Sequence, residues 1–222
     1  LGGMNYGVTL LEMVAAYQIF PNGGIYTEPY SYTRVETADG TVILEHTPIS
    51  NRVISSESAT VLNHLLQGVT TGTYGTGTTA KFSAMPVAGK TGTSDNDNNQ
   101  WFIGVTPYYV GVCWLGYDIP EQIRYYSYAP PIIYKNIMGP IHQNLAVVQF
   151  QDDPDVEVLE YCTITGDLAG DDCETTATGW DKPSNIPPVC DGDHDVNKKD
   201  EDEEDQDQDE DEKKDEDEED DR

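Results

Sequence analysis

The stretch Val87-Ala88-Gly89-Lys90-Thr91-Gly92-Thr93-Ser94 places one lysine beside two glycines and three hydroxyl side chains. A lysine at a strand end is a positive point charge, and glycine lets a ligand approach the backbone because it has no Cβ atom. This combination indicates an anion-binding site. The alternative is an ordinary exposed edge strand with a solvated lysine. A phosphate-binding P-loop is disfavoured, because its first glycine is missing and a strand follows where that motif needs a helix.

Two further strand-like segments follow this stretch. The three segments span residues 85–93, 100–105 and 109–117. Their connections are a tight Thr106-Pro107 turn and a longer polar loop at residues 94–99, which together favour an antiparallel meander. Combined with helical patterns elsewhere in the chain, the meander predicts an α+β fold in which an antiparallel sheet is flanked by helices.

Three helices are predicted around these strands. Thr9-Leu10-Leu11-Glu12 is a capping box and predicts a helix from Leu10 to Phe20. A second helix is predicted at residues 56–69, and a third extends over apolar residues from Ile132 to Val148. The apolar face expected for the second helix consists of Ala59, Leu62, Leu65, Leu66 and Val69.

Charge is distributed unevenly along the 222 residues, which carry a formal net charge of −29. Residues 1–150 contain 10 acidic and 6 basic side chains, whereas residues 151–222 contain 31 acidic and 6 basic ones. We therefore expect a folded domain at 1–150, a polar cysteine-containing linker at 151–195 and a disordered polyacidic tail at 196–222. The negative charge excludes nucleic acid as a partner of this tail.

The cysteines and histidines match no metal-binding motif. Cys113 lies in an apolar run and is expected to be buried. Three cysteines of the predicted linker could form one disulfide and leave one thiol free, and their spacings match no zinc pattern. We expect no metal and no cofactor. These linker cysteines are Cys162, Cys173 and Cys190, and the histidines interpreted as surface or hydrogen-bonded residues are His46, His64, His142 and His194.

Several stretches of residues 2–148 together resemble the C-terminal part of a penicillin-binding protein transpeptidase domain. Lys90-Thr91-Gly92 is one of three motifs of the penicillin-recognising serine acyltransferases, and the wider match most resembles the class A bifunctional glycosyltransferase/transpeptidases. The resemblance implies part of a serine β-lactamase/transpeptidase-like fold. It is carried by Gly7-Val8-Thr9 through Asn22-Gly23-Gly24, by residues 69–77 and 87–94, by Trp101-Phe102-Ile103-Gly104-Val105-Thr106-Pro107 and by Gly111-Val112-Cys113-Trp114-Leu115-Gly116-Tyr117-Asp118.

The resemblance implies a role for each residue of the Lys-Thr-Gly strand. Lys90 would set a positive field beside a nucleophilic serine and assist proton transfer. The hydroxyls of Thr91 and Thr93 would hold the terminal carboxylate of a D-Ala-D-Ala stem peptide or of a β-lactam antibiotic. The backbone N–H of Thr93 would supply half of an oxyanion hole, and Gly92 would keep the approach open. Trp101 is expected to line the core or the wall of the cleft.

The family's other two motifs are not found in their expected places. No lysine of the chain has serine three residues before it, so the Ser-x-x-Lys nucleophile is absent from these 222 residues. Ser94-Asp95-Asn96 reads as Ser-x-Asn, but it follows Lys-Thr-Gly instead of preceding it, and we interpret it as a polar turn. An acyl-enzyme needs an activated serine, so we expect the chain alone to be inactive.

We therefore interpret the chain as the C-terminal part of a membrane-anchored peptidoglycan synthase at the extracytoplasmic face of the membrane. We expect its anchor and the N-terminal half of the same protein to lie outside this sequence. The intact protein is expected to cross-link stem peptides by serine acyl transfer. A D,D-carboxypeptidase or β-lactamase-like serine hydrolase is one alternative, and a non-catalytic penicillin-binding scaffold is another.

Overall fold

The computed structural model describes residues 7–124 and 129–194 of the chain. It separates into two compact units, unit 1 over Leu1–Val156 and unit 2 over Glu157–Arg222. Unit 1 contains the segments that resemble a transpeptidase domain. No described helix is both long enough and apolar enough to cross a bilayer.

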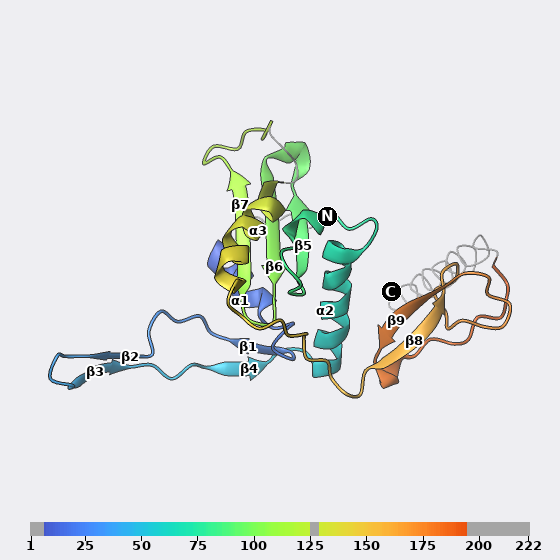
Figure 1. Cartoon of the computed structure of the whole chain (residues 1–222), viewed down its shortest axis with the longest axis horizontal. Helices are drawn as coiled ribbons and strands as arrows, with labels where there is room; N and C mark the ends of the chain where they lie inside the picture. The colour runs from blue at the N-terminus through green and yellow to red at the C-terminus, as the bar shows by residue number, and fades with distance from the viewer. Residues whose placement is uncertain (1–6, 125–128, 195–222) are drawn as a thin grey trace, which may run out of the picture. The chain divides into compact units, whose positions relative to one another are not determined.

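A three-stranded antiparallel sheet forms the centre of unit 1 (Figure 1). Its strand order is β5-β6-β7, so β5 is an edge strand. The register places Lys90 opposite Ile103, and Ile103 opposite Val112. The predicted meander is therefore confirmed. The strands are β5 (Ala88–Thr93), β6 (Asn99–Val105) and β7 (Val110–Gly116).

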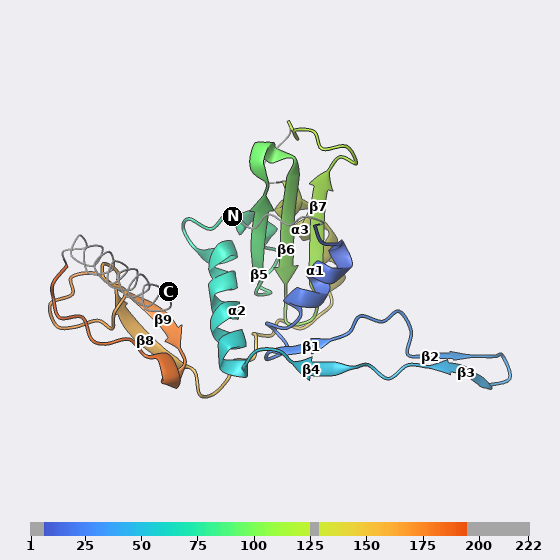
Figure 2. The same cartoon turned by 180° about the vertical axis from the view of Figure 1, so that it is seen from behind.

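Helices cover both faces of this sheet. α3 (Ala129–His142) packs on one face and α1 (Leu10–Tyr17) on the other, as the front and back views in Figures 1 and 2 show. α2 (Ser56–Thr71) runs alongside β5. The mixture of helices and an antiparallel sheet confirms the predicted α+β class.

The core of unit 1 lies between the sheet and α3. Phe102 of β6 and Tyr134 of α3 are 0% and 1% exposed, and their rings meet edge to face with centroids 5.1 Å apart. This geometry is favourable for two aromatic rings. The buried side chains around them are Ala80, at the end of the short helix η1 (Thr78–Ala80), and Phe82, Met85, Val87 and Met138.

The capping box predicted at the start of α1 is confirmed. The Thr9 hydroxyl accepts from the backbone N–H of Glu12 at 3.2 Å, and the Glu12 carboxylate accepts from the backbone N–H of Thr9 at 2.7 Å. α1 ends at Tyr17, three residues before the predicted Phe20, because the chain enters a turn closed by a bond from the N–H of Gly24 to the carbonyl of Ile19.

Two other helix predictions need correction. α3 ends at His142 and not at Val148, because the N–H of Leu145 bonds to the carbonyl of His142 in a tighter turn. The apolar face predicted for α2 is only partly buried, since Leu65 is 64% exposed and Leu62 is 39% exposed. The helix instead buries small and polar side chains, namely Ala59, Thr60, Asn63 and Thr70.

Two short antiparallel pairs lie outside the central sheet of unit 1. β1 (Ile25–Thr27) pairs with β4 (Ser50–Arg52). β2 (Arg34–Glu36) pairs with β3 (Val42–Glu45), and every residue of these two strands is exposed. Figure 1 shows the β2–β3 hairpin extending away from the sheet. These pairs therefore add little to the core.

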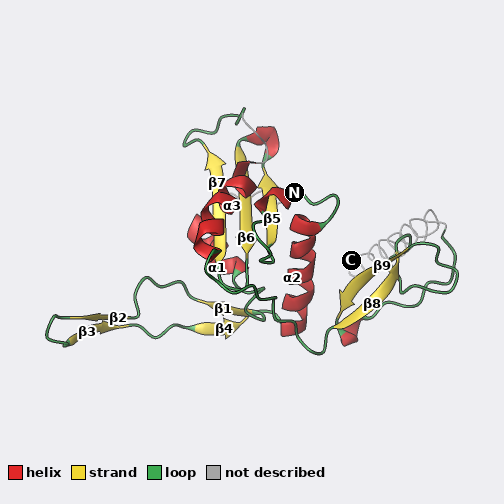
Figure 3. Cartoon of the chain, viewed as in Figure 1, coloured by secondary structure: helices red, strands yellow, loops and turns green. Residues whose placement is uncertain are grey.

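Unit 2 is folded where the sequence predicted a polar linker. β8 (Glu157–Cys162) and β9 (Thr176–Asp181) pair antiparallel over six residues each, and the short helix η3 (Pro183–Asn185) follows β9. Figure 3 shows the two strands joined by long loops. Tyr161 and Leu168 form a further antiparallel bridge. The strand pairing was not predicted because this segment contains few apolar residues.

Replacing Gly104 by alanine should destabilise unit 1. A Cβ atom at Gly104 would lie 2.4 Å from Cζ of Tyr134 and 2.8 Å from Cε1 of Phe102, both in the packed core. Such overpacking costs about 1–3 kcal/mol. We expect a lower urea midpoint for Gly104→Ala when unfolding is followed by circular dichroism.

Gly68→Ala is the matched control for this substitution. Gly68 lies in α2, and a Cβ atom there would have nothing within 4 Å. Alanine stabilises an exposed helical site by up to about 1 kcal/mol relative to glycine. Equal midpoints for the Gly104→Ala variant and the wild type would contradict the packing described here.

Candidate active-site groove

A groove of about 950 Å³ runs along β5, and we refer to it as the Lys90 groove. One side is formed by residues at and before α1, including Thr9, Met13 and Tyr17. Trp101 and Trp114 lie in its wall, which agrees with the cleft-wall role considered for Trp101. The four residues to which the sequence assigned substrate contacts all line it, namely Lys90, Thr91, Gly92 and Thr93.

Strand register explains how β5 and the two tryptophans meet. Gly92 lies opposite Trp101 on β6, and Trp101 lies opposite Trp114 on β7. The two indole rings have centroids 6.3 Å apart, and Nε1 of Trp114 donates to Oδ1 of Asn99 at 3.0 Å. Gly92 carries no side chain, so the groove stays open where β5 faces the indole of Trp101.

Lys90 brings a positive charge to this groove. Its side chain is exposed, and Nζ donates to the backbone carbonyl of Thr91 at 2.8 Å. Within the described ranges 7–124 and 129–194, Lys90 forms no ion pair. The ammonium group is therefore available to attract an anionic ligand.

The hydroxyls beside Lys90 differ in their partners. The Thr91 hydroxyl lies 2.7 Å from the Thr76 hydroxyl, which fixes its position next to the lysine. Thr93 is exposed at the end of β5. Because β5 is the edge strand, a further extended peptide could pair with its backbone, as in β-strand addition.

The turn after β5 confirms the interpretation of Ser94-Asp95-Asn96. These residues lead into the short helix η2 (Asp95–Asp97), in which Asn96 has a left-handed φ of 58°. The Ser94 hydroxyl accepts from the backbone N–H of Asn99 at 2.9 Å. Its hydrogen bond thus serves the connection to β6.

Tyr17 gives the groove a neutral polar wall. Burial raises the pKa of its phenol. The phenol is therefore uncharged at neutral pH, so Tyr17 adds no negative charge to the groove that Lys90 also lines.

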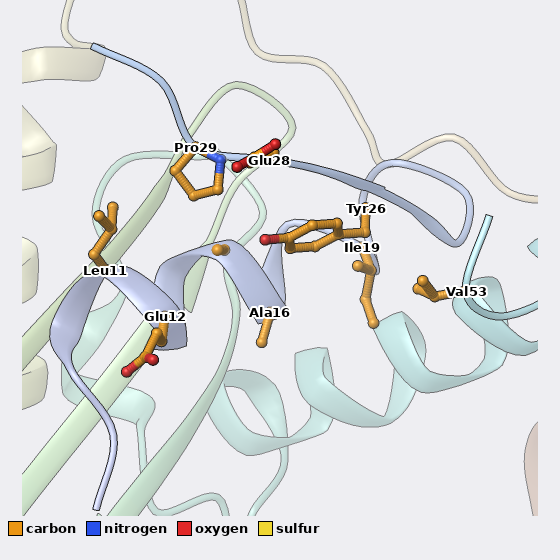
Figure 4. Close-up of a pocket in the computed structure, with 9 residues that line it drawn as sticks. Leu11, Glu12, Ala16, Ile19, Tyr26, Glu28, Pro29 and Val53 are labelled. Carbon is orange, nitrogen blue, oxygen red and sulfur yellow. The ribbon is translucent and has the colours of Figure 1, made fainter. Parts of the chain in front are cut away.

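A second hollow, of about 590 Å³, lies between α1 and β1 (Figure 4). Its lining is mainly apolar and includes Leu11, Ile19 and Tyr26. The Glu12 carboxylate borders it but is already bonded to Thr9 in the capping box. This hollow therefore offers packing surface and no free catalytic group on Glu12.

The structure divides the histidines into different roles. His142 is buried, with Nδ1 2.7 Å from the carbonyl of Met138 and Nε2 2.9 Å from the Thr106 hydroxyl. Nε2 of His64 lies 3.0 Å from Oδ1 of Asp152. His194 is half-buried, and its Nε2 lies 3.5 Å from the Sγ atom of Cys190, a neighbour that the spacing of the sequence did not predict. Cys113 is only partly buried, at the edge of the core.

Comparisons with known proteins give one family model and several similar proteins. Residues 2–139 match the family model described as penicillin binding protein transpeptidase domain. The chain is 42% identical over 142 residues to penicillin-binding protein 1A of Clostridium acetobutylicum, covering 64% of this chain and 17% of that protein. It is 35% identical over 133 residues to penicillin-binding protein 4 of Bacillus subtilis, covering 60% of this chain and 21% of that protein. The chain thus spans about a fifth of these relatives.

Solved structures show the same fold. Penicillin-binding protein 1A of Haemophilus influenzae matches 81% of this chain and 32% of its own with a TM-score of 0.70 at 19% identity. The D,D-transpeptidase domain of a peptidoglycan glycosyltransferase from Eggerthella lenta matches 64% of this chain and 33% of its own, with a TM-score of 0.52 at 26% identity. An imipenem acyl-enzyme complex of penicillin-binding protein A from M. tuberculosis matches 63% of this chain and 33% of its own, with a TM-score of 0.51 at 22% identity.

The α1 cap that borders the groove should weaken in acid. Hydrogen bonds from the backbone and then the hydroxyl of Thr9 lower the pKa of Glu12 below its ordinary 4.5. A carboxylate whose pKa is depressed by folding contributes stability above its ordinary pKa and loses it as the pH falls through the lowered value. We expect the wild type to have a higher urea midpoint than Glu12→Gln at about pH 6, and the difference to be much smaller at about pH 3, because the contribution is lost as the pH falls through the lowered pKa.

Glutamine is the matched variant because it can still reach the N-terminal N–H while it no longer titrates. Midpoints measured between these two pH values supply the test. A difference between wild type and Glu12→Gln that does not change with pH would contradict a titrating cap.

Proposed function

Because the chain belongs to the penicillin-binding protein transpeptidase domain family, we propose that it supplies the Lys-Thr-Gly side of the active site of a D,D-transpeptidase. The observation that carries the proposal is the Lys90 groove. A lysine that forms no ion pair with the described residues, two threonines and a glycine lie on an edge strand, and this arrangement suits an extended peptide with a terminal carboxylate.

Each residue of the strand has a distinct chemical task in this proposal. Lys90 attracts the substrate carboxylate and stabilises the serine nucleophile's developing charge. The hydroxyls of Thr91 and Thr93 donate to that carboxylate, and the Thr93 backbone N–H donates to the oxyanion of the tetrahedral intermediate. This stabilisation acts where charge develops in the transition state, so it accelerates the acylation step itself.

The nucleophile in this proposal comes from sequence outside these 222 residues. Ser-x-x-Lys occurs nowhere in the chain. The intact protein would attack D-Ala-D-Ala stem peptides, release the terminal D-alanine and pass the acyl group to an amine of a neighbouring stem peptide. β-Lactams would acylate the same serine, and penicillin-binding protein A from M. tuberculosis forms such an acyl-enzyme complex with imipenem. The reaction would occur at the extracytoplasmic face of the membrane.

The 222-residue chain alone should not be acylated by penicillin. Covalent labelling needs an activated serine, and the chain lacks the Ser-x-x-Lys motif. We expect no fluorescent band after incubation with a fluorescent penicillin and denaturing electrophoresis. A penicillin-binding protein that contains Ser-x-x-Lys serves as the positive control. Stoichiometric labelling of the chain would refute the proposed division of the site.

The role of Lys90 can be tested in a chimera. Residues 2–139 would replace the matching region of a penicillin-binding protein that carries Ser-x-x-Lys. Lys90→Ala should slow penicillin acylation by roughly 10²-fold or more, the scale of a lost acid–base or electrostatic group. Lys81→Ala is the matched control, since Lys81 is exposed and does not line the groove.

The two variants separate electrostatics at the site from general surface charge. Each removes one positive charge, so the chimeras differ only in where that charge lay. Equal acylation rates for Lys90→Ala and Lys81→Ala would contradict the assignment of Lys90. A chimera that folds but shows no acylation in its unsubstituted form would count against the proposed function itself.

A further inference from the structure

Unit 2 gathers three thiols and an imidazole at one point. Cys162 ends β8, Cys173 lies in the loop before β9, and Cys190 and His194 follow η3. One ligand atom from each of the four residues lies within 4.8 Å of every other. The four residues are defined here as the Cys3His cluster. All four residues belong to unit 2, and none of them is among the residues that line the Lys90 groove.

The distances in this cluster have the values of tetrahedral coordination. Nε2 of His194 lies 3.5 Å from the Sγ atom of Cys162, 3.7 Å from that of Cys173 and 3.5 Å from that of Cys190. Zinc bonds of about 2.3 Å to sulfur and about 2.1 Å to nitrogen, at tetrahedral angles, place S and N roughly 3.6 Å apart. The imidazole nitrogen is therefore equidistant from the three sulfurs in the way that one central ion would require.

Hydrogen bonds to residues 167–170 hold the three cysteines of the cluster in position. The backbone N–H of Cys162 donates to the carbonyl of Asp167 at 2.9 Å, and that of Cys190 donates to the carbonyl of Leu168 at 2.8 Å. The N–H of Gly170 donates to Sγ of Cys173 at 3.4 Å. Bonds of this last kind orient metal ligands in protein sites. The thiols are thus held in place by the fold of the loop between β8 and β9.

Gly170 allows this loop to approach the cluster. A Cβ atom at Gly170 would lie 2.6 Å from the carbonyl oxygen of Cys190. Any larger residue would push the loop away from the segment that carries Cys190 and His194. The close approach therefore joins the Cys173 side of the cluster to the Cys190 side.

Burial in unit 2 points to the same conclusion. Within described residues 157–194, the only buried residues are Cys162 at 1% exposure and Cys190 at 7%. The centre of this unit consists of ligand atoms where other domains have aliphatic and aromatic side chains. Folded units below about 40 residues usually need a metal, a disulfide or a partner to be stable.

A disulfide accounts for fewer of these observations than a metal ion does. All three cysteines have free thiols in the structure. One disulfide would use two of the three sulfurs. It would not explain why the third thiol and His194 lie beside them. A single metal ion uses all four donors at once. Thiolate and imidazole donors are soft or intermediate ligands, and Cys3His is a closed donor set that zinc occupies in structural sites.

We propose that Cys162, Cys173, Cys190 and His194 bind one Zn²⁺ ion, which stabilises the fold of unit 2. The four protein ligands complete a tetrahedral shell and leave no position for substrate, so the role is structural. Zinc displaces the thiol protons on binding, and the fold of unit 2 is then coupled to metal occupancy. This site is independent of the acyl-transfer function proposed for unit 1.

Metal binding to the reduced 222-residue chain tests this proposal directly. The chain is dialysed with Zn²⁺ and the bound metal is measured by mass spectrometry, with one zinc per chain expected. Co²⁺ is then bound in place of zinc to follow the thiolate-to-cobalt charge-transfer absorption. Carboxylates do not produce this band, so it separates the cluster from cation binding by the acidic residues of the chain.

Variants identify the ligands. Cys173→Ser and His194→Ala should each weaken cobalt and zinc binding by more than the roughly 10- to 100-fold that loss of an outer hydrogen-bonding partner costs. Cys113→Ser and His64→Ala are matched controls and should bind like wild type, because both residues lie in unit 1. Zinc should also slow the reaction of three of the four thiols with a thiol reagent, leaving that of Cys113 unchanged.

Several results would overturn the assignment. One is a reduced wild-type chain that shows no thiolate-to-cobalt band. Another is undiminished binding by both Cys173→Ser and His194→Ala. A third is a disulfide between two of the three cysteines, found by peptide mapping without reductant in chain that holds no zinc. The wild-type measurements remain decisive even if a variant fails to fold.

Discussion

A row of glycines across the central sheet is the constraint on which the rest of unit 1 depends. Gly89 lies opposite Gly104, and Gly104 lies opposite Gly111, so all three strands lack a side chain at one level. Tyr134 fills the space, since Cβ atoms at Gly104 and Gly111 would lie 2.4 Å and 3.0 Å from its ring. Aromatic packing against bare backbone thus determines where α3 lies.

The same row determines the position of Lys90. Successive side chains of a strand point to opposite faces, so the residue after Gly89 points away from α3. A slip of one residue would send Lys90 into the core beneath α3, where its charge would be desolvated. The packing of Tyr134 therefore places the lysine, together with Ile103 and Val112 of its register, on the groove face.

Local signals predicted those parts of the fold that local interactions determine. The Thr9–Glu12 capping box, the meander and the polar turn after Thr93 were all visible because each depends on neighbouring residues. The face of α2 was predicted less well, since Leu65 is exposed while Asn63 is buried. Helical periodicity identifies an apolar stripe, but which stripe is covered depends on packing with segments distant in the sequence.

The candidate site shows the same division between local and distant information. Lys90 and its hydroxyl neighbours were identifiable because they are contiguous, and a motif depends on spacing alone. The position of Tyr17 in the groove lining and the hydrogen bond between Thr76 and Thr91 depend on tertiary structure, so no local sequence pattern predicts them. The Cys3His cluster was missed for the same reason, because its cysteines are widely spaced and no Cys-x-x-Cys marks them.

Acidic side chains are frequent in the sequence around the Cys3His cluster. Seven carboxylates lie within two residues of a cluster member along the chain, namely Glu160, Asp171, Asp172, Glu174, Asp191, Asp193 and Asp195. A divalent ion at the centre of the cluster would offset this negative charge. Carboxylates raise the local concentration of every cation alike, and only the sulfur and imidazole donors discriminate between metals. The acidic sequence therefore attracts cations in general, and the cluster provides the selectivity for zinc.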